Sequence, residues 1–491
     1  MKILVIDQGT TLTKAFVLTD DGEFNCIGRI AHQQFYPGSG LVEQNAEELA
    51  GNIESLIDQA LAQQSGIEGI TLANQGETVV AWDRRTKKPL HHALVWQDQR
   101  TQTTLDRLPS EVRANIAAKS GLPVDAYFSA SKLGWLLANV SEISDAARAG
   151  YLGLGTSDVF FIDRLTGEYS TDATTASRTS LMNLQTLRWD PDLCRIFGVP
   201  IEMLAEIRPS AGFFGTVRRS GRKIPLTASV VDQQAALFGH HCRSKGDVKI
   251  TFGTGSFALV NTGHTPVVDR QGMISTVAWV VSGESPVYAL EGGDYTAFAA
   301  VNWAMRLGLA KDISDFRLPD GPSALERGLV FVPALAGLAA PHWDRAATGL
   351  WIGLRQDTTA EDMRCALLEG IALRAVEVVE NLPTSGEKPI CIDGGLSAIP
   401  SFARFLANAL GRPVRLSRTP DTTALGAAEL GVLGLGRVLP EERHENRMLI
   451  TPTDASSAIQ QSRGTFAEAI AFSRTFGRKR GMASSLSAPG T

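Results

Sequence analysis

Two short Gly-Thr turns, each set between strand-like runs, lie about half a chain apart in this sequence. The first, at residues 6–11, runs on into Lys14 and the apolar residues 15–18, and the second, at residues 250–256, runs on into residues 257–260. A strand, a Gly-Thr turn and a returning strand bring backbone N–H groups and a hydroxyl together around phosphate oxygens. The pair therefore predicts two similarly folded halves that hold one nucleotide between them.

The length and the composition narrow the class of protein. A chain of 491 residues exceeds what one hydrophobic core normally supports, so we expect two or more domains. The formal net charge of -5 shows no excess of positive charge for binding nucleic acid. The five cysteines form no Cys-x-x-Cys pair, which is typical of a protein of a reducing compartment. The sequence shows neither a signal peptide nor an apolar run of about 18 residues, so we expect a cytoplasmic protein without a membrane span.

Helix and strand patterns alternate along the first half of the chain. Residues 2–18 have the pattern of a hairpin, and strands are expected at residues 69–73 and 79–83. Asn45 is an expected helix N-cap with Glu48 at the third helical position, and an apolar stripe at helical spacing follows. This alternation is typical of an α/β domain.

The second half has a similar pattern after an expected domain joint at residues 215–245. Thr359 and Asp362 predict the start of a long helix. The expected elements are a hairpin from residue 248, helices at residues 360–381, 402–410 and 423–433, and a last helix at residues 456–473. The helix at 423–433 is rich in Ala and Gly and should pack closely, whereas the polar residues 478–491 are expected to be disordered.

Two aspartates stand where chemistry is expected. Asp7 ends a strand beside the first turn, where a carboxylate could hold Mg²⁺ next to phosphate. A turn-capping role is the alternative, but the second Gly-Thr turn favours the metal. Asp232 lies at a strand-to-helix turn, where a carboxylate can take the proton of a sugar hydroxyl during phosphoryl transfer; an ordinary N-cap is the alternative.

Aromatic residues suggest a sugar-binding wall. Trp96 follows a strand, and its ring could lie against the C–H face of a polyol. A core position is the alternative for Trp96, and also for Tyr127 and Phe257. The Gly253-Thr254-Gly255 segment also fits a loose dinucleotide-binding pattern, but a strand rather than a helix follows it.

Many segments in order resemble the FGGY carbohydrate kinases, most closely the glycerol kinases, from residue 2 to about residue 437. The segments that carry the resemblance include Asp7-Gln8-Gly9-Thr10-Thr11, Asn74-Gln75-Gly76-Glu77-Thr78, Ala176-Ser177-Arg178-Thr179, Asp232-Gln233-Gln234-Ala235-Ala236, Phe252-Gly253-Thr254-Gly255 and Asp393-Gly394-Gly395. The resemblance implies an α/β fold of two actin/Hsp70-like (ribonuclease H-like) ATPase domains flanking a deep cleft. Residues 1–241 would bind a sugar or polyol, residues 242–440 would bind ATP, and residues 441–491 would form a C-terminal helix and a disordered tail.

The resemblance also implies an activity and the residues that perform it. The activity is ATP-dependent phosphorylation of a small polyol or sugar with Mg²⁺, in a homodimer or homotetramer without nucleic-acid or membrane partners. Asp232 would be the base, and Asp7 and Asp232 would hold the metal. The remaining implied site residues are Thr10, Thr11, Gly253, Thr254, Gly394 and Gly395 for the nucleotide, and Gly76, Glu77, Trp96, Tyr127, Asp232 and Phe257 for the substrate.

Three positions depart from the glycerol-kinase pattern. Gly76 stands where those enzymes have Arg, which removes up to five hydrogen-bond donors and leaves space. We therefore expect a substrate with four or five carbons, a polyol or a ketose, with a true glycerol kinase as the alternative. Phe298 replaces Gly and Ile399 replaces Asn on the nucleotide side. These two changes motivate a further alternative, a non-catalytic ATP-binding regulatory protein on the same fold.

Overall fold

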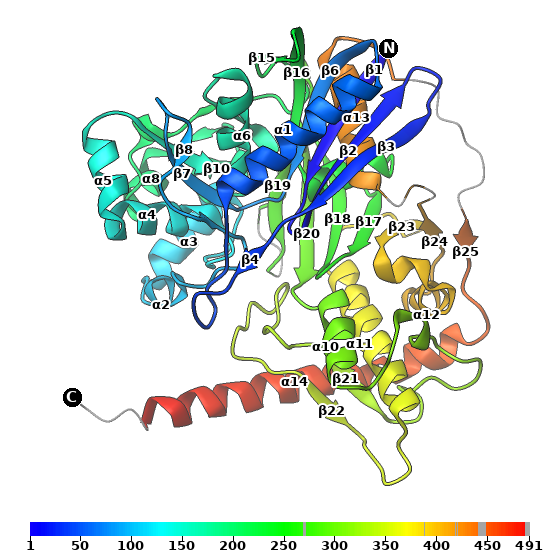
Figure 1. The fold of residues 1–491 in the computed structure, drawn as a ribbon. Helices are drawn as coiled ribbons and strands as arrows, with labels where there is room; N and C mark the ends of the chain where they lie inside the picture. The colour runs from blue at the N-terminus through cyan, green and yellow to red at the C-terminus, as the bar shows by residue number, and fades with distance from the viewer. Residues whose placement is uncertain (269–271, 387, 418, 420, 440–447, 487–491) are drawn as a thin grey trace.

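The computed structural model describes residues 1–268, 272–386, 388–417, 419, 421–439 and 448–486. Two halves, each built on a mixed sheet, lie side by side in Figure 1. In the described part of the chain, none of the helices combines the length and the apolar character needed to cross a bilayer.

The first half is built on a six-stranded sheet in the order β15-β16-β6-β1-β2-β3. Its strands are β1 Lys2–Gln8, β2 Leu12–Thr19, β3 Phe24–Ala31, β6 Ile67–Asn74, β15 Thr216–Arg219 and β16 Arg222–Val231. The hairpin prediction is confirmed, since β1 and β2 pair antiparallel, while β6 pairs parallel with both β1 and β16. Helix α1, Ala46–Gln63, begins at the predicted N-cap, where the side chain of Asn45 accepts hydrogen bonds from the N–H groups of Glu47 and Glu48.

A second layer of the first half carries shorter elements, which extend to one side of the sheet in Figure 1. Its main sheet has the order β10-β7-β9-β5-β4, with β8 paired to β7. The strands are β4 Gln34–Phe35, β5 Glu43–Gln44, β7 Val79–Asp83, β8 Lys88–Pro89, β9 Ala93–Leu94 and β10 Leu152–Thr156. The helices are α2 Gln102–Asp106, α3 Ser110–Ser120, α4 Ser129–Asn139, α5 Ser141–Arg148, α6 Ser157–Thr166, α7 Ala173–Ala176 and α8 Pro191–Phe197. Two small pairs complete this layer, β11 Ser170–Asp172 with β14 Glu206–Arg208, and β12 Met182–Asn183 with β13 Arg188–Trp189.

The second half repeats the strand arrangement of the first. Its sheet has the order β19-β20-β18-β17-β23-β24-β25, in which β17 pairs antiparallel with β18 and parallel with β23, as β1 does with β2 and β6. The strands are β17 Val248–Phe252, β18 Ser256–Gly263, β19 Ile274–Trp279, β20 Val287–Asp294, β23 Ile390–Gly394, β24 Val414–Leu416 and β25 Leu449–Ile450. This repeat is the two-domain actin/Hsp70-like architecture that we expected.

Helices cover the second sheet. They are α10 Phe298–Arg306, α11 Ala360–Glu380 and α12 Pro400–Leu410, with the small pair β21 Val330–Val332 and β22 Leu350–Ile352 beside them. Helix α11 begins with the predicted capping box, in which Thr359 and Asp362 exchange hydrogen bonds between side chain and backbone.

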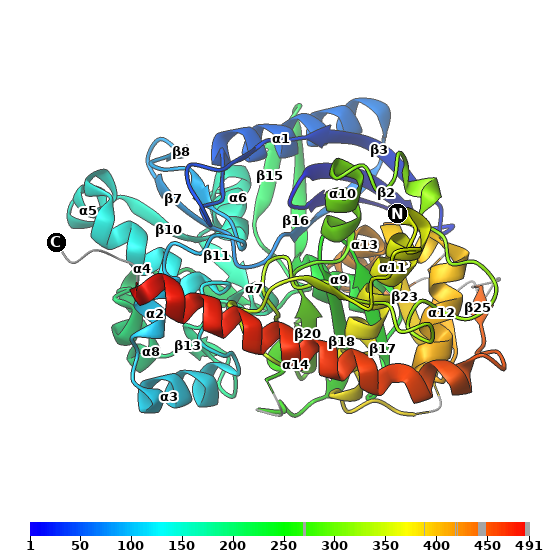
Figure 2. The same ribbon diagram turned by 90° about the horizontal axis from the view of Figure 1, so that it is seen from below.

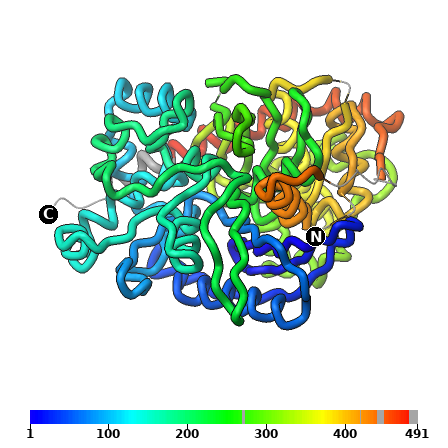
Figure 3. Tube along the Cα trace, turned by 90° about the horizontal axis from the view of Figure 1, so that it is seen from above, coloured from blue at the N-terminus to red at the C-terminus, as the bar shows by residue number. Residues whose placement is uncertain are grey.

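Two helices join the halves, α9 Asp232–Gly239 and α13 Thr422–Gly434. Glycines allow α13 to approach so closely that a Cβ added at Gly426 would lie 1.9 Å from the carbonyl oxygen of Ala235 in α9. A Cβ added at Gly434 would lie 1.8 Å from the carbonyl oxygen of Thr227 in the first sheet. The prediction of close packing is confirmed, and Figure 3 shows α13 (orange) beside the N-terminal strands (blue). The domain limits at residues 241 and 440 stay a prediction.

Helix α14, Ser456–Leu486, is longer than expected. The prediction of disorder from residue 478 is wrong as far as residue 486, and residues 487–491 lie outside the described residues. The guanidinium groups of Arg474 and Arg478 lie 3.2 and 3.0 Å from the buried carboxylate of Asp344, which anchors this part of α14 on the second half. These ion pairs join positions far apart in the sequence, so composition alone could not reveal them. Figure 2 shows α14 as the long red helix.

Candidate active site

A cavity of about 210 Å³ lies where the strands of both sheets end. The β1–β2 turn, the segment after β6, the β17–β18 turn and the start of α9 all contribute to its wall. It is lined by Asp7, Gly9, Thr10, Gln75, Gly76, Glu77, Trp96, Tyr127, Asp232, Gln233, Thr251, Gly253, Thr254, Gly255, Phe257 and Thr423. Both Gly-Thr turns therefore face one cavity.

Most of the site residues predicted from the sequence meet in this cavity, but three do not line it. Thr11 is exposed on the first turn, next to the lining residue Thr10. Gly394 pairs with Phe252 across β17 and β23, and its φ of +89° and the 2.2 Å between an added Cβ and the carbonyl oxygen of Phe252 require glycine there. Gly395 follows directly, beside the Gly253-Thr254 turn.

The cavity holds three carboxylates, and burial changes their acidity. Burial raises the pKa of Asp7 to about 6, although the ammonium of Lys14 lies 3.8 Å from Asp7 Oδ2 and lowers it. Burial, together with the negative charges of Asp7 and Glu77, raises the pKa of Asp232 to about 7. A carboxylate with a pKa near 7 suits a general base at neutral pH.

Asp232 is the first residue of α9, and Val231 occupies the N-cap position. The alternative interpretation of Asp232 as an ordinary N-cap is therefore wrong. Its Oδ1 accepts a hydrogen bond of 2.7 Å from the N–H of Gln233, which fixes the carboxylate at the helix start. The other oxygen faces no hydrogen-bond donor that the structure records among the described residues, and the side chain lines the cavity.

The loop after β6 is a tight turn. Glu77 has a φ of +58°, and the N–H of Thr78 donates to the carbonyl oxygen of Gly76 at 2.7 Å. A non-glycine residue in this conformation is typical of a functional site. A Cβ added at Gly76 would lie 3.2 Å from Val231 Cγ1. The space beside Gly76 is thus smaller than the missing arginine alone would suggest, because Val231 fills part of it.

Sequence reasoning missed Arg178 as a site residue, although its segment 176–179 carried the resemblance. Its Nε donates to Glu77 Oε1 at 2.5 Å, and its two terminal nitrogens donate to the carboxylate of Glu291 at 2.9 Å each. One of these nitrogens also lies 3.3 Å from the hydroxyl of Tyr127. Arg178 is buried and does not line the cavity, so it orients Glu77 and Tyr127 without touching the cavity itself.

Three aromatic rings form one wall. The rings of Trp96 and Tyr127 stand perpendicular at 5.7 Å between centroids, and Phe257 lies 6.4 Å from Trp96. The indole N–H of Trp96 donates to Thr10 Oγ1 at 3.1 Å, which joins this wall to the first Gly-Thr turn. Burial raises the pKa of Tyr127 well above its usual range, so its phenol stays neutral. The aromatic rings therefore lie beside the first Gly-Thr turn, in the same cavity as Asp232.

The carboxylates of the cavity suit a magnesium ion that is bound together with phosphates. Mg²⁺ is usually held by one or two protein carboxylates together with substrate phosphates and water, and Asp7 and Asp232 offer two carboxylates in the same cavity. Among the described residues, no group of three or more His, Cys, Asp or Glu side chains is arranged to hold a metal ion by itself. Any metal here would therefore depend on the phosphates for the rest of its ligands.

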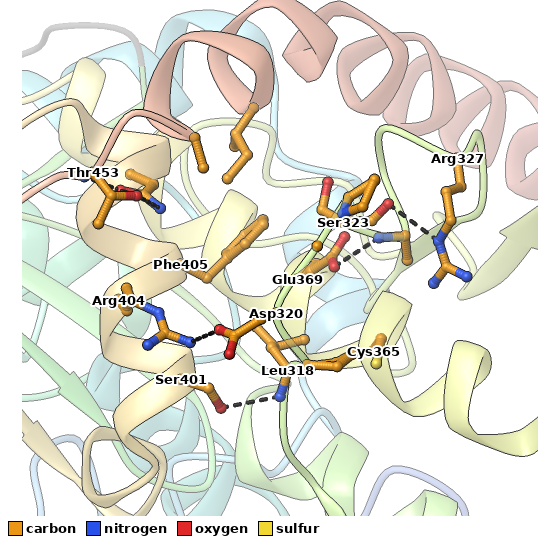
Figure 4. Close-up of a pocket in the computed structure, with 17 residues that line it drawn as sticks. Leu318, Asp320, Ser323, Arg327, Cys365, Glu369, Ser401, Arg404, Phe405 and Thr453 are labelled. Carbon is orange, nitrogen blue, oxygen red and sulfur yellow. Dashed lines mark hydrogen bonds and ion pairs between the residues drawn. The ribbon is translucent and has the colours of Figure 1, made fainter.

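A second cavity of about 260 Å³ lies between α11, α12, residues 318–327 and the start of α14 (Figure 4). Its charged side chains have polar partners. Glu369 accepts hydrogen bonds of 2.8 Å from the N–H groups of Ala324 and Leu325, and Arg404 lies 2.8 Å from Asp320. None of the site residues predicted from the sequence lines it.

Comparison with known proteins agrees with this geometry. The models for the N-terminal and C-terminal domains of the FGGY family of carbohydrate kinases match residues 2–239 and 248–435. A glycerol kinase of Haloferax volcanii is 38% identical over 454 residues, covering 88% of this chain and 89% of that protein. A glycerol kinase of Thermus brockianus is 39% identical over 464 residues, covering 91% and 94%.

Solved structures give the same result. The structure of Plasmodium falciparum glycerol kinase with ADP superposes with a TM-score of 0.85 at 30% identity, covering 96% of this chain and 98% of that one. A xylulose kinase of Lactobacillus acidophilus, at 22% identity and a TM-score of 0.81, shares the fold over 95% of this chain and 97% of that one. The chain belongs to the FGGY family of carbohydrate kinases, enzymes that transfer a phosphoryl group to an alcohol.

Proposed function

We propose that the protein transfers the γ-phosphoryl group of ATP to a terminal hydroxyl of a neutral polyol or ketose with four or five carbons. The observation that carries the proposal is the position of Asp232, whose carboxylate faces the cavity between the aromatic wall and the Gly-Thr turns and has a pKa of about 7. Such a carboxylate is ionised often enough at neutral pH to accept a hydroxyl proton.

The proposed phosphoryl transfer uses residues that line the cavity. Asp232 takes the proton of the substrate hydroxyl while that oxygen forms a bond to the γ-phosphorus, and the bond from this phosphorus to the leaving ADP oxygen breaks. Backbone N–H groups of the two turns and the hydroxyls of Thr10 and Thr254 surround the phosphates and stabilise the developing charge. Asp7 and Asp232 would hold Mg²⁺, which supplies positive charge at the phosphoryl oxygens when bound.

The substrate class follows from the groups at the sugar end. Glu77 and Asp232 are hydrogen-bond acceptors when ionised, and the buried Gln75 Oε1 has no hydrogen-bond partner among the described residues. Substrate hydroxyls can donate to these acceptors, whereas an acidic substrate would meet like charge. Arg178 does not replace the donors lost at Gly76, because its recorded bonds go to Glu77, Glu291 and Tyr127. A longer substrate would bring further hydroxyls to this end.

A true glycerol kinase is the second candidate, favoured by relatives of that name at 38–39% identity. ADP release measured with polyols and ketoses of three to five carbons separates the two candidates by kcat/KM. The proposed activity predicts turnover that Asp232→Asn removes, while the control Asp320→Asn, at a largely exposed carboxylate of the second cavity, keeps it. Glycerol as the best substrate, with a micromolar KM, would overturn the longer-substrate part alone. The cytoplasmic location and the homodimer or homotetramer stay predictions. Light scattering measures the oligomeric state.

A further inference from the structure

Tyr127 stands on a short segment, residues 125–128, that leads into α4. The two peptide groups of a residue set its backbone angles and therefore the direction of its side chain. Here both groups are held by charged side chains. The N–H of Tyr127 donates to Asp125 Oδ1 at 2.8 Å, and its carbonyl oxygen accepts a hydrogen bond of 2.8 Å from Lys132 Nζ. The position of the ring beside Trp96 in the aromatic wall therefore depends on these two contacts.

Lys132 is a fully buried lysine near the start of α4. Its ammonium turns back past the helix start and donates to three successive carbonyl oxygens, of Ala126, Tyr127 and Phe128, at 2.8, 2.8 and 3.0 Å. An ammonium has three donors, so each of them is used. A positive charge near a helix N-terminus and inside a protein is unfavourable, and burial lowers the pKa of Lys132 to about 8, which leaves it charged at neutral pH. A lysine kept at such a place is expected to have a role, and its contacts point to the segment of Tyr127.

Asp125, the acceptor for the N–H of Tyr127, is held from the second half. Arg345 donates to Asp125 Oδ1 at 2.7 Å and to Oδ2 at 3.3 Å. The guanidinium carbon of Arg345 also lies 3.8 Å from the centre of the Tyr295 ring, and this cation–π contact adds to the attachment of the guanidinium. The segment before α4 is thus bound by one cation from its own helix and by another from the second half.

We propose that Lys132 and Arg345 are positioning residues for the substrate, which hold Tyr127 in the wall of the cavity although neither of them lines it. The same segment is tied to a second side chain of the substrate end, because Ser129 Oγ donates to the carbonyl oxygen of Glu77 at 3.2 Å. Loss of either cation should therefore displace groups at the substrate end and leave the two Gly-Thr turns in place. The inference rests on the proposed function, since it takes Tyr127 as part of the polyol site.

Steady-state kinetics with ATP and glycerol, erythritol or xylitol separates the substrate end from the nucleotide end. Lys132→Met removes the three donors at a similar side-chain length, and we expect it to raise the KM of the polyol by about 5- to 100-fold, because a small displacement of a positioned group is costly. Arg345→Met should act in the same direction. The KM of ATP should stay within about twofold, whereas partial unfolding would lower the apparent kcat without changing either KM.

The matched control is Lys119→Met, at a lysine of α3 that pairs with Asp190 and Asp192, and it should change neither KM. Equal polyol KM values in the wild type, Lys132→Met and Arg345→Met would contradict the proposal.

Fluorine NMR tests the positioning without turnover. The chain has six tyrosines, 3-fluorotyrosine labels them all, and the Tyr127 signal is the one that Tyr127→Phe removes. In Lys132→Met this signal should shift or broaden, whereas that of Tyr151, which lies under the guanidinium of Arg85, should stay unchanged. An unchanged Tyr127 signal with the melting temperature preserved would overturn the inference. If Lys132→Met does not fold, Arg345→Met decides by the same signal, because the Arg345 side chain is partly exposed. Turnover of none of the three polyols would count against the proposed function alone, since the fluorine signal still decides the positioning.

Discussion

Replacing Arg178 by Met tests whether this buried guanidinium holds the substrate end of the site together. Arg178 is the charge partner of both Glu77 and Glu291, and all three side chains are almost completely buried. Methionine has a similar length and fills similar volume, so the change removes the charge and its hydrogen bonds more than the packing. Two carboxylates would then remain in the interior without their cation.

The expected loss is large. Breaking a buried ion pair by removing one partner typically destabilises a protein by about 3–5 kcal/mol, because the remaining charge is left uncompensated. Arg178 serves two carboxylates, so we expect the free energy of unfolding to fall by at least about 3 kcal/mol at pH 7. Arg178→Lys keeps the charge but cannot reproduce the two-pronged contact with Glu291, so its loss should be intermediate.

The pH dependence gives an independent check. Burial raises the pKa of Glu77 above its usual value of 4.5, and the positive charge of Arg178 opposes that rise. Without Arg178 the pKa of Glu77 in the folded state rises further, while the unfolded value stays the same. A carboxyl whose folded pKa is raised destabilises the protein above that pKa and ceases to do so as it becomes protonated. The deficit of Arg178→Met should therefore shrink as the pH falls from 7 toward 5.

Urea titration at pH 7 and at pH 5, followed by intrinsic fluorescence, measures both effects. Arg148→Met is the matched control, because Arg148 pairs with Asp145 on the surface and its removal should change stability by less than about 0.5 kcal/mol. The reasoning fails if Arg178→Met loses less than about 1 kcal/mol at pH 7, or if its deficit is the same at both pH values.

Four other measurements test the site and the fold. The kcat/KM of the wild type should rise with pH to a plateau above about pH 7, because Asp232 accepts a proton only when ionised, and a flat profile from pH 5 to 8 would contradict its role as base. Asp7→Asn should raise the Mg²⁺ concentration for half-maximal activity several-fold, and an unchanged Mg²⁺ titration would exclude Asp7 as a ligand. The single variant Gly76→Arg should bind substrate poorly, since Val231 lies 3.2 Å from the new Cβ. The double variant Gly76→Arg with Val231→Gly should shift kcat/KM toward glycerol, and no shift would count against the proposed role of Gly76. Gly426→Ala should lower the free energy of unfolding by about 1–3 kcal/mol or more, because its Cβ would meet the backbone of Ala235, whereas the control Gly464→Ala, at an exposed position inside α14, should raise it slightly, because Ala favours a helix more than Gly does.

The parts of the fold that depend on local chemistry could be predicted from the sequence. The β1–β2 and β17–β18 hairpins follow from short strand patterns around Gly-Thr turns, and the N-cap at Asn45 and the capping box at Thr359 mark helix starts. The repeat of one strand order in two halves also follows, because two similar hairpins predict two similar sheets. Each of these signals is contained in a short stretch of neighbouring residues.

The parts that depend on distant partners could not be predicted. Arg178 and Glu291 are 113 residues apart, and nothing near either residue shows that the two side chains share one buried contact. The same holds for Val231, which reaches the space beside Gly76, and for Arg478, which pairs with Asp344 and extends α14. These contacts form only when segments far apart in the sequence pack together: the two halves for Arg178, neighbouring strands of the first half for Val231, and the last helix on the second half for Arg478.

Two ion pairs join the halves at the substrate end of the cavity, in addition to the ion pair of Lys14 with Asp421 and the packing of α13 on the first sheet. Arg178 of the first half binds Glu291 of the second sheet, and Arg345 of the second half binds Asp125, whose Oδ1 also accepts the N–H of Tyr127. The structure records no such ion pair between Thr10 and Thr254 or the residues that flank them in the two turns, within the described chain. An opening at the substrate end would expose or break buried charges at a cost of several kcal/mol.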